Sequence, residues 1–295
     1  MNQTALVYQA YGPEAVFREC LWSLISLARW VSPEEAPPIL IYTDNPQWFV
    51  DRGISFPITF CPLDAATIKA WRGPHDFVHR LKIELLLDAR KRYKGPLLYL
   101  DTDTEFIQSP LPLLQRVAAG DLFMHVSEGR LSRPQQPVLN KLLKAFESRK
   151  IGAGLGIIVT QATEMWNAGV LGFSGHADRI LQRTLELTDA LYPQYPKHIV
   201  EQFAFSVAFS EAGNVHSAAP WIFHYWNFKE WRLWLASFFN YFRKAAWREL
   251  VRQSSRMPIH VPLQEKMGFY QGRSLWGKIT KEKWQPSLPD WEDQS

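Results

Sequence analysis

Two carboxylates stand at the end of an apolar run near the middle of the chain. The run Leu97–Leu100 is followed by Asp101 and Asp103. In a strand, residues two positions apart point to the same side, and both side chains still converge if the strand gives way to a loop. Carboxylates at the carboxyl end of a buried strand are typical ligands of Mg²⁺ or Mn²⁺. The segment therefore predicts a divalent-metal site, although a strand followed by an acidic turn has the same short pattern.

Composition and charge are those of an ordinary globular protein. The 295 residues are 46% hydrophobic and 21% charged, with a net charge of +4, which does not favour nucleic-acid binding. The two cysteines, Cys20 and Cys61, are too few for a disulfide framework or a cysteine-rich metal cluster. The sequence has neither a run of about 18 apolar residues nor a basic and then apolar leader, so we expect a cytoplasmic protein.

The segments around the acidic pair alternate between strand and helix patterns. Strands are predicted over 5–10, 39–43 and 56–63, and the prolines of the last favour an edge position. Helical spacing of apolar residues follows the first strand over 14–30 and precedes the acidic strand over 79–87. This alternation predicts an α/β fold with a mostly parallel central sheet and flanking helices.

Four further features follow the acidic pair. Residues 127–150 are polar and basic, which indicates either a solvated loop and helix or a mobile lid. The segment Asn167–Gly169 precedes an apolar strand; its small residues let a ligand approach the backbone, and its amide both donates and accepts. Glu201 and Gln202 open a predicted helix, and His224 lies among aromatic residues. Taken singly, none of these features decides the function.

The window 229–256 combines aromatic and basic residues. It holds seven Lys or Arg residues and two acids, and its apolar side chains fall on one face of a single predicted amphipathic helix. Interfacial helices show this pattern, but a helix that packs its aromatic face on the domain shows it equally well. Interleaved aromatics and cations also suit single-stranded nucleic acid, but no RNA-binding motif accompanies them.

Together, these separated segments resemble a GT-A nucleotide-sugar glycosyltransferase, nearest to the retaining group that includes glycogenin and lipopolysaccharide galactosyltransferases. Each motif is short, and the more specific signal is their order and approximate spacing over residues 5–231. The resemblance implies a GT-A catalytic domain over 1–228. From the aromatic and basic window we expect a C-terminal helical extension over 229–295 that binds a membrane surface or the acceptor. The matching segments are Arg80, Tyr99–Asp103, Asn167–Leu171, Glu201 with Gln202, and His224 with Lys229.

The resemblance also implies a role for each matching residue. Asp101, Asp103 and His224 would hold Mn²⁺ or Mg²⁺. Gln202 would lie beneath the anomeric carbon and Glu201 would bind a sugar hydroxyl, and these are the two catalytic positions. The donor-binding residues would be Tyr8, Asp44, Arg80, Asp101, Asn167, Ala168, Gly169 and Lys229, the last on the departing β-phosphate.

The implied reaction is metal-dependent transfer of a hexose from a nucleotide sugar, expected to be a UDP-sugar, to a glycan or lipid-linked acceptor. A metal ion held by hard oxygens neutralises the charge that grows on the leaving diphosphate, and a lysine adds a second positive charge. The sequence offers no clear carboxylate to deprotonate the acceptor. That absence fits a retaining, front-side route in which the leaving phosphate takes the proton.

Several positions depart from the family pattern. The family has Asp where Glu201 stands, and it has Gly near the position of Asn227. Its Lys-Pro-Trp motif comes one residue later than the Lys-Glu-Trp run that starts at Lys229. Residues 127–160 form a longer insert than the family has, which predicts an acceptor-specific part.

Two alternatives from other classes remain open. The run Asp101–Thr104 also resembles the first motif of haloacid-dehalogenase-type phosphatases, in which Asp101 would be the nucleophile. That class needs a paired-acid motif downstream, which we do not find, and places its first motif near the N-terminus. The second alternative is a non-catalytic membrane-surface protein, based on the window 229–256. A glycosyltransferase that reaches the inner face of a membrane through this window would combine both ideas.

Overall fold

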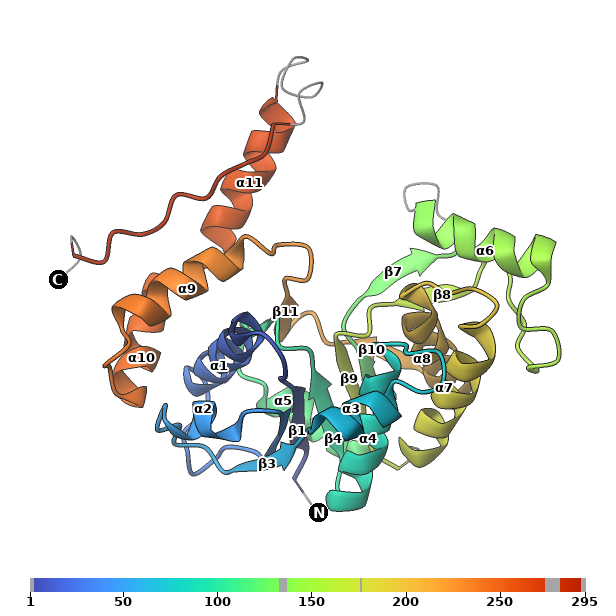
Figure 1. Ribbon diagram of the computed structural model, residues 1–295, viewed down its shortest axis with the longest axis horizontal. Coiled ribbons are helices and arrows are strands. Elements are labelled where there is room, and N and C mark those ends of the chain that lie inside the picture. Colours follow the sequence, from blue (N-terminus) through green and yellow to red (C-terminus); the bar gives the residue numbers. More distant parts are fainter. Residues whose placement is uncertain (1–2, 133–136, 176, 274–281, 293–295) are drawn as a thin grey trace.

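The centre of the molecule is a seven-stranded sheet in the order β10-β6-β9-β4-β1-β2-β3 (Figure 1). The computed structural model describes residues 3–132, 137–175, 177–273 and 282–292. Only β9 runs antiparallel to its neighbours, so the predicted mostly parallel sheet is confirmed, with β3 at an edge. The strands of this sheet are β1 (Ala5–Gln9), β2 (Ile39–Thr43), β3 (Ile58–Pro62), β4 (Leu97–Leu100), β6 (Leu122–Met124), β9 (Val170–Phe173) and β10 (Val215–Ser217).

Alternate residues of the central strands enter two different hydrophobic cores. In β1, Leu6 and Tyr8 belong to one core, whereas Ala5 and Val7 belong to the other. Strands that are buried on both faces read as continuous apolar runs rather than as an alternation of apolar and polar residues. This is why the run that ends at Leu100 could be recognised as a buried strand.

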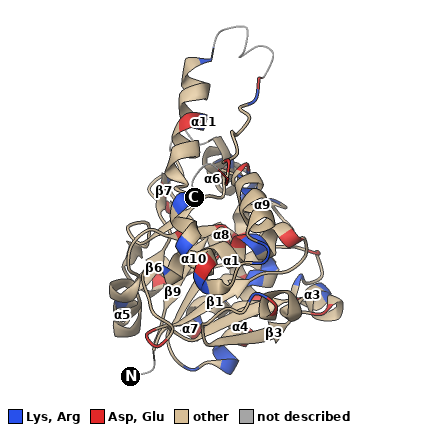
Figure 2. Cartoon of the chain, turned by 90° about the vertical axis from the view of Figure 1, so that its left-hand side faces the viewer, with Lys and Arg blue, Asp and Glu red and all other residues tan. Residues whose placement is uncertain are grey.

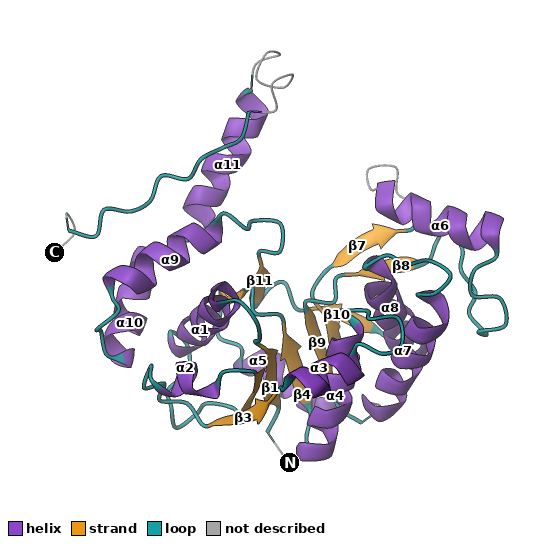
Figure 3. Cartoon of the chain, in the orientation of Figure 1, coloured by secondary structure: helices purple, strands orange, loops and turns teal. Residues whose placement is uncertain are grey.

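Helices cover both faces of the sheet (Figure 3). Capping residues set some of the helix ends: Asp64 accepts a hydrogen bond from the Thr67 N–H, and Gly120 ends its helix with a left-handed φ of 111°. One core includes residues of α1 (Glu14–Ala28), α2 (Pro46–Val50) and α5 (Leu111–Ala119). The other includes residues of α4 (Arg80–Arg92), α7 (Ala177–Leu191) and α8 (Ile199–Ala212), and α3 (Ala65–Trp71) packs against it.

Two short antiparallel pairs lie beside the main sheet. The pair formed by β5 (Thr104–Phe106) and β11 (Ile222–His224) brings two distant segments together. The other pair joins β7 (Ser127–Arg130) and β8 (Glu164–Trp166). The helix of the insert, α6 (Pro137–Arg149), buries apolar side chains in a third core shared with α7 and α8. The insert is thus anchored to the body of the molecule through these contacts.

The predicted single helix over 229–256 is divided in the structure. Helix α9 (Trp231–Tyr241) ends before Ala246, whose backbone is extended, and α10 (Trp247–Gln253) then starts in a new direction. The change of direction lets Trp247 pack on Phe56, with ring centroids 5.8 Å apart. A 3₁₀ turn (Ser254–Arg256) and α11 (His260–Gly272) follow.

The aromatic face of α9 is covered by the protein itself. Trp231 and Phe238 pack on Trp22 of α1, with ring centroids 5.9 and 5.7 Å away. Phe228 belongs to the same core, so residues on both sides of the predicted domain boundary share one hydrophobic cluster.

Figure 2 shows basic and acidic residues interspersed around α9 and α10. In the part of the chain that the structure describes, no helix has the length and hydropathy needed to cross a bilayer. The division at 228/229 and membrane contact both stay predictions.

Candidate metal centre and its cavities

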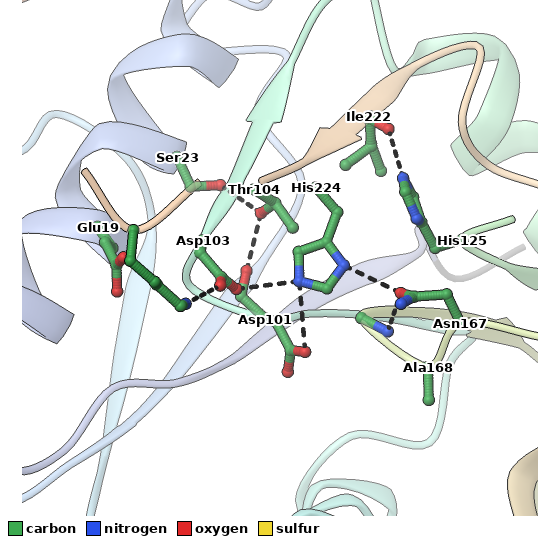
Figure 4. A network of polar contacts seen from close by, with 12 residues as sticks. Glu19, Ser23, Asp101, Asp103, Thr104, His125, Asn167, Ala168, Ile222 and His224 are labelled. Carbon is green, nitrogen blue, oxygen red and sulfur yellow. Dashed lines mark hydrogen bonds and ion pairs between the residues drawn. The ribbon is translucent and has the colours of Figure 1, made fainter. Parts of the chain in front are cut away.

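The three residues predicted to hold a metal ion meet at one point (Figure 4). The turn between β4 and β5 carries Asp101 and Asp103, and the pairing of β5 with β11 puts His224 opposite Thr104. His224 Nε2 lies 3.1 Å from Asp103 Oδ1 and 3.8 Å from Asp101 Oδ2. One ligand atom from each residue lies within 4.8 Å of the other two.

A hydrogen bond to Asn167 fixes the imidazole of His224. His224 Nδ1 lies 2.9 Å from Asn167 Oδ1, which also accepts from the Gly169 N–H at 3.0 Å. The amide Nδ2 donates to Glu128 Oε1 at 3.0 Å, which agrees with this orientation of the amide. Since an amide oxygen only accepts, Nδ1 of His224 carries the proton. With a second proton, Nε2 donates to Asp103 Oδ1 and the ring is a cation; without that proton, Nε2 presents a lone pair to a metal ion.

This set of donor atoms fits a divalent cation. Two carboxylates and an imidazole lone pair that face each other repel one another unless a proton or a cation lies between them. Carboxylate oxygens and a neutral imidazole are both established metal ligands, and the Nδ1–H bond to Asn167 is the outer contact that commonly orients a ligating histidine. Asp101, Asp103 and His224 would therefore hold the ion.

A second imidazole packs edge-on against His224. The rings of His125 and His224 have centroids 5.3 Å apart and an interplanar angle of 84°. His125 Nε2 lies 3.2 Å from the Ile222 carbonyl oxygen, to which it donates (Figure 4). Burial, together with the nearby charge of His224, lowers the pKa of His125 to about 4, so its ring is neutral at neutral pH. His125 was not among the residues predicted from the sequence.

Gly169 has a steric reason to be glycine. A Cβ at this position would lie 2.1 Å from Cε1 of His224, far inside van der Waals contact. The Gly169 carbonyl accepts a hydrogen bond of 2.8 Å from the Asp101 N–H. The small residue that was predicted to admit a ligand thus admits the imidazole of the metal centre, and it lines the adjoining cavity as well.

Lys229 lies against Asp103, with 2.5 Å between Nζ and Oδ2. Burial by itself would raise the pKa of the Asp103 carboxyl. The hydrogen bond and charge of His224 and the ammonium of Lys229 outweigh burial and hold that pKa well below its usual range. Asp103 is therefore ionised throughout the physiological pH range, as a metal ligand must be. The Lys229 side chain is half exposed, at the edge of a cavity.

A buried lysine beneath the centre was missed by the sequence analysis. Lys82 Nζ lies 3.2 Å from Asp101 Oδ1 and 3.2 Å from Glu201 Oε1, and it donates to the Ala168 carbonyl at 3.2 Å. Burial would lower the pKa of this ammonium, but the charges of Asp101 and then Glu201 raise it above the usual value. Lys82 therefore stays charged and neutralises two acids at the floor of the site.

Lys82, rather than Arg80, is the cation of α4 at the site. The Arg80 guanidinium pairs with Asp189 at 2.7 Å and with Glu84 at 2.9 Å, and it lines neither cavity described below. The sequence did indicate that Lys82 lies on the buried face of its helix. The residues three, four and seven positions after it share that face and are apolar. These positions are Leu85, Leu86 and Ala89, all buried.

The two predicted catalytic positions have different surroundings. Glu201 is buried, and burial raises the pKa of its carboxyl to about 7; the charge of Lys82 lowers this pKa and that of Asp101 raises it further. Gln202 Nε2 donates to Glu128 Oε2 at 2.9 Å. Glu128 also accepts from Asn167, so one carboxylate joins the two amides of the site. Glu128 was missed because nothing in its polar segment distinguishes it before β7 and β8 are paired.

Two cavities meet at the acidic pair, at the sheet edge where the strand order turns between β1 and β4. The larger measures about 710 Å³ and the smaller about 370 Å³. Lys229 lines only the smaller cavity. Both are lined by His79, Lys82, Asp101 and Asp103, and the larger is also lined by Asn167, Ala168, Gly169, Glu201, Gln202 and His224. Burial and the charge of Lys82 lower the pKa of His79 to about 4.

The remaining predicted donor contacts lie outside the cavities. The Tyr8 side chain is fully buried, with its hydroxyl 3.0 Å from Ser23 Oγ, and it therefore packs in the core. Asp44 is exposed and accepts hydrogen bonds of 3.1 and 3.2 Å from the Gly12 N–H. Gly12 lines the smaller cavity, so Asp44 holds the loop after β1 in place.

Comparison with known proteins shows similarity in fold only. No protein-family model matches the chain, and no curated protein matches its sequence. The crystal structure of the glycosyltransferase GlyE from Streptococcus pneumoniae TIGR4 superposes with a TM-score of 0.51 and 14% identity over 87% of this chain. This chain spans 64% of that structure. The chain has the GT-A fold. The predicted fold class is thus confirmed.

Two further solved structures with lower TM-scores are also glycosyltransferases. Mouse xyloside xylosyltransferase 1 has a TM-score of 0.49 and 14% identity, over 72% of this chain and 84% of its own. The galactosyltransferase LgtC, in complex with donor and acceptor sugar analogues, has a TM-score of 0.46 and 15% identity, over 70% of each chain.

Proposed function

We propose that the chain is a metal-dependent glycosyltransferase that moves a hexose from a UDP-sugar to a hydroxyl of a glycan or lipid-linked acceptor, with retention of configuration. One observation carries the proposal: Asp101, Asp103 and His224 converge within 4.8 Å where two cavities of a GT-A fold meet. The chemistry needs a site of this kind, since a diphosphate leaving group must be held by positive charge.

The smaller cavity is the proposed place for the nucleoside diphosphate. Its volume of about 370 Å³ lies in the range of about 300–1,000 Å³ that ligand pockets have. Lys229 and Arg232 line it on one side, where Lys229 is paired with Asp103 and Arg232 with Glu19, and these two cations would also contact the diphosphate. A divalent ion at the acidic pair, proposed to be Mn²⁺ or Mg²⁺, neutralises the charge that develops on the leaving diphosphate. Lys82 pairs with Asp101 at 3.2 Å.

The polar wall of the larger cavity is the proposed place for the transferred sugar. Asn167, Glu201 and Gln202 line it and offer hydrogen-bonding groups for sugar hydroxyls. In the proposed step, the bond from the acceptor oxygen to the anomeric carbon forms as the bond from that carbon to the β-phosphate oxygen breaks. The leaving phosphate takes the acceptor proton from the same side, which gives retention. Gln202 lies beneath the reacting carbon in this proposal.

The two alternatives have less support than this proposal. The GT-A fold is not the fold that a haloacid-dehalogenase-type phosphatase requires, and Asp101 is held by Lys82 and by a 2.7 Å hydrogen bond from the Tyr99 hydroxyl. A role on the inner face of a membrane would use exposed residues of α9 and its surroundings, among them Leu233 and Arg243, because the aromatic face is buried.

The test is release of the nucleoside diphosphate from a panel of nucleotide sugars, with and without Mn²⁺. We expect Mn²⁺-dependent turnover of at least one UDP-hexose and a loss of about a hundredfold or more in Asp103→Asn, because one metal ligand is removed. Asp51→Asn, at an exposed position away from both cavities, is the matched control and should keep wild-type turnover. If no nucleotide sugar is turned over, or if Asp103→Asn equals wild type, the proposal fails.

A further inference from the structure

The larger cavity has a second wall with a different chemistry from the first. Beside the polar residues of the metal centre, apolar side chains from four segments of the chain line the same space. They are Val126 before β7, Pro137, Val138 and Leu139 of α6, Ile199 of α8, and Trp226 after β11. None of them has a role in holding the metal or the diphosphate.

Three residues of this apolar wall are unusually exposed. Trp226 is 52%, Val138 45% and Val126 37% exposed. Scattered exposed apolar residues need no explanation, but these three come from distant segments and face one cavity. Removing such surface from water is favourable, so an apolar group that enters the cavity is stabilised there.

The wall is held in place by its own core. Leu139 is almost fully buried, and its neighbours on α6, Leu142 and Leu143, pack in the cluster shared with α7 and α8. Ile199 belongs to the same cluster at the start of α8. Because these side chains pack against a buried core, the apolar surface keeps its shape when no ligand is bound. This favours a preformed binding site.

The donor does not account for this wall. In the proposed function the nucleoside diphosphate lies in the smaller cavity and the hexose against the polar wall of the larger one. The acceptor is the reactant left to contact the apolar side. We propose that the acceptor carries an alkyl aglycone next to its accepting sugar, and that the alkyl chain lies along Val126, Val138 and Trp226. This inference rests on the proposed function and assigns the acceptor class to the same site.

The experiment is calorimetric binding of paired glycosides, octyl and methyl β-glycosides of the same sugars, below the micelle concentration. The wild-type protein with Mn²⁺ and UDP should bind the octyl member at least about tenfold more tightly, since several methylenes leave water. In Val138→Asn this ratio should fall to about threefold or less, because a polar amide replaces part of the wall. Val50→Asn, at a helical valine that is also exposed (54%) and lies outside both cavities, should keep the wild-type ratio.

The inference is overturned if the wild-type protein binds both members equally, or if Val50→Asn loses the preference as Val138→Asn does. The latter result, or an unchanged ratio in Val138→Asn, would show that the octyl chain does not bind specifically along this wall. Phenyl glycosides are a third arm: tighter binding of phenyl than of octyl members would assign the wall to an aryl group and contradict the alkyl aglycone. Failure of the proposed function gives a different result, namely no turnover of any nucleotide sugar whatever the glycoside binding shows.

Discussion

The imidazole of His224 and the amide of Asn167 are joined through Nδ1 and Oδ1, 2.9 Å apart, and this contact orients the metal centre. It directs Nε2 of the ring toward Asp103 and Asp101. The same amide oxygen accepts from Gly169, and the same amide nitrogen donates to Glu128. Asn167 thus connects the ligand set to the polar wall of the larger cavity.

Replacing Asn167 by Ala should weaken Mn²⁺ binding by about ten- to a hundredfold. The three ligands remain, but the imidazole loses the acceptor that fixes its tautomer and orientation. Calorimetric titration with Mn²⁺ measures the effect. Asn240→Ala, at an exposed position on α9, is the control and should bind the ion as wild type does. If Asn167→Ala and wild type bound Mn²⁺ with equal affinity, the Asn167 amide would not be needed to orient the His224 imidazole.

Replacing Lys82 by Met should destabilise the fold by about 3–5 kcal/mol, because two carboxylates at the floor of the site lose their counter-ion. The free energy of unfolding from urea titration measures this loss. Adding Glu201→Gln to Lys82→Met should restore part of the stability, since one of the stranded charges is then removed. If the double variant is less stable than Lys82→Met, the charge argument is wrong.

Glu201 should make stability depend on pH between about 4.5 and 7. Its pKa rises from 4.5 to about 7 on folding, so the folded state binds the additional proton within that window. The contribution of Glu201 is present below about pH 4.5 and is lost as the pH rises toward 7, by up to about 3 kcal/mol.

The free energy of unfolding of wild type minus that of Glu201→Gln isolates this contribution. His79 and His125 titrate in both proteins, so their opposite pH dependence cancels in the difference. The difference should fall from pH 4.5 to 7. A difference that rises with pH would mean that Glu201 is ionised in the folded state well below pH 7.

Arg80 and Lys82 should differ in their effect on nucleotide binding. Arg80→Gln loses ion pairs with Asp189 and Glu84, partly exposed acids, so the unfolding free energy should fall by about 1 kcal/mol. Its affinity for UDP with Mn²⁺ should stay within about twofold of wild type, because Arg80 lines neither cavity. Lys82→Gln should weaken UDP binding by about tenfold or more, through loss of the cation beside Asp101. If Arg80→Gln weakened UDP binding by about tenfold and Lys82→Gln did not, Arg80 would be the donor-binding residue instead.

Much of the fold could be predicted from the sequence because the central strands are buried on both faces. Such strands form uninterrupted apolar runs, and the helices between them repeat their apolar residues near every fourth position. The division of 229–256 into α9 and α10 could not be predicted, since Trp247 turns toward Phe56, which lies far away in sequence. A local pattern contains no information about such a partner.

The candidate site could be predicted where its residues form short motifs, as Asp101, Asp103 and Asn167 do. Glu128 and His125 could not, because each depends on pairing between segments that are distant in the sequence. Lys82 is an intermediate case: its place on the apolar stripe of α4 was visible, but Arg80 was the more conspicuous cation.

The central claim is that Asp101, Asp103 and His224 hold a divalent ion through which a nucleoside diphosphate binds. Calorimetric titration of UDP into the protein, with Mn²⁺ and with a chelator, tests it most directly. We expect UDP to bind with Mn²⁺, to bind at least about tenfold more weakly with the chelator, and to lose this metal dependence in Asp103→Asn. Equal UDP affinity with and without Mn²⁺, or a metal dependence that survives in Asp103→Asn, would contradict the claim.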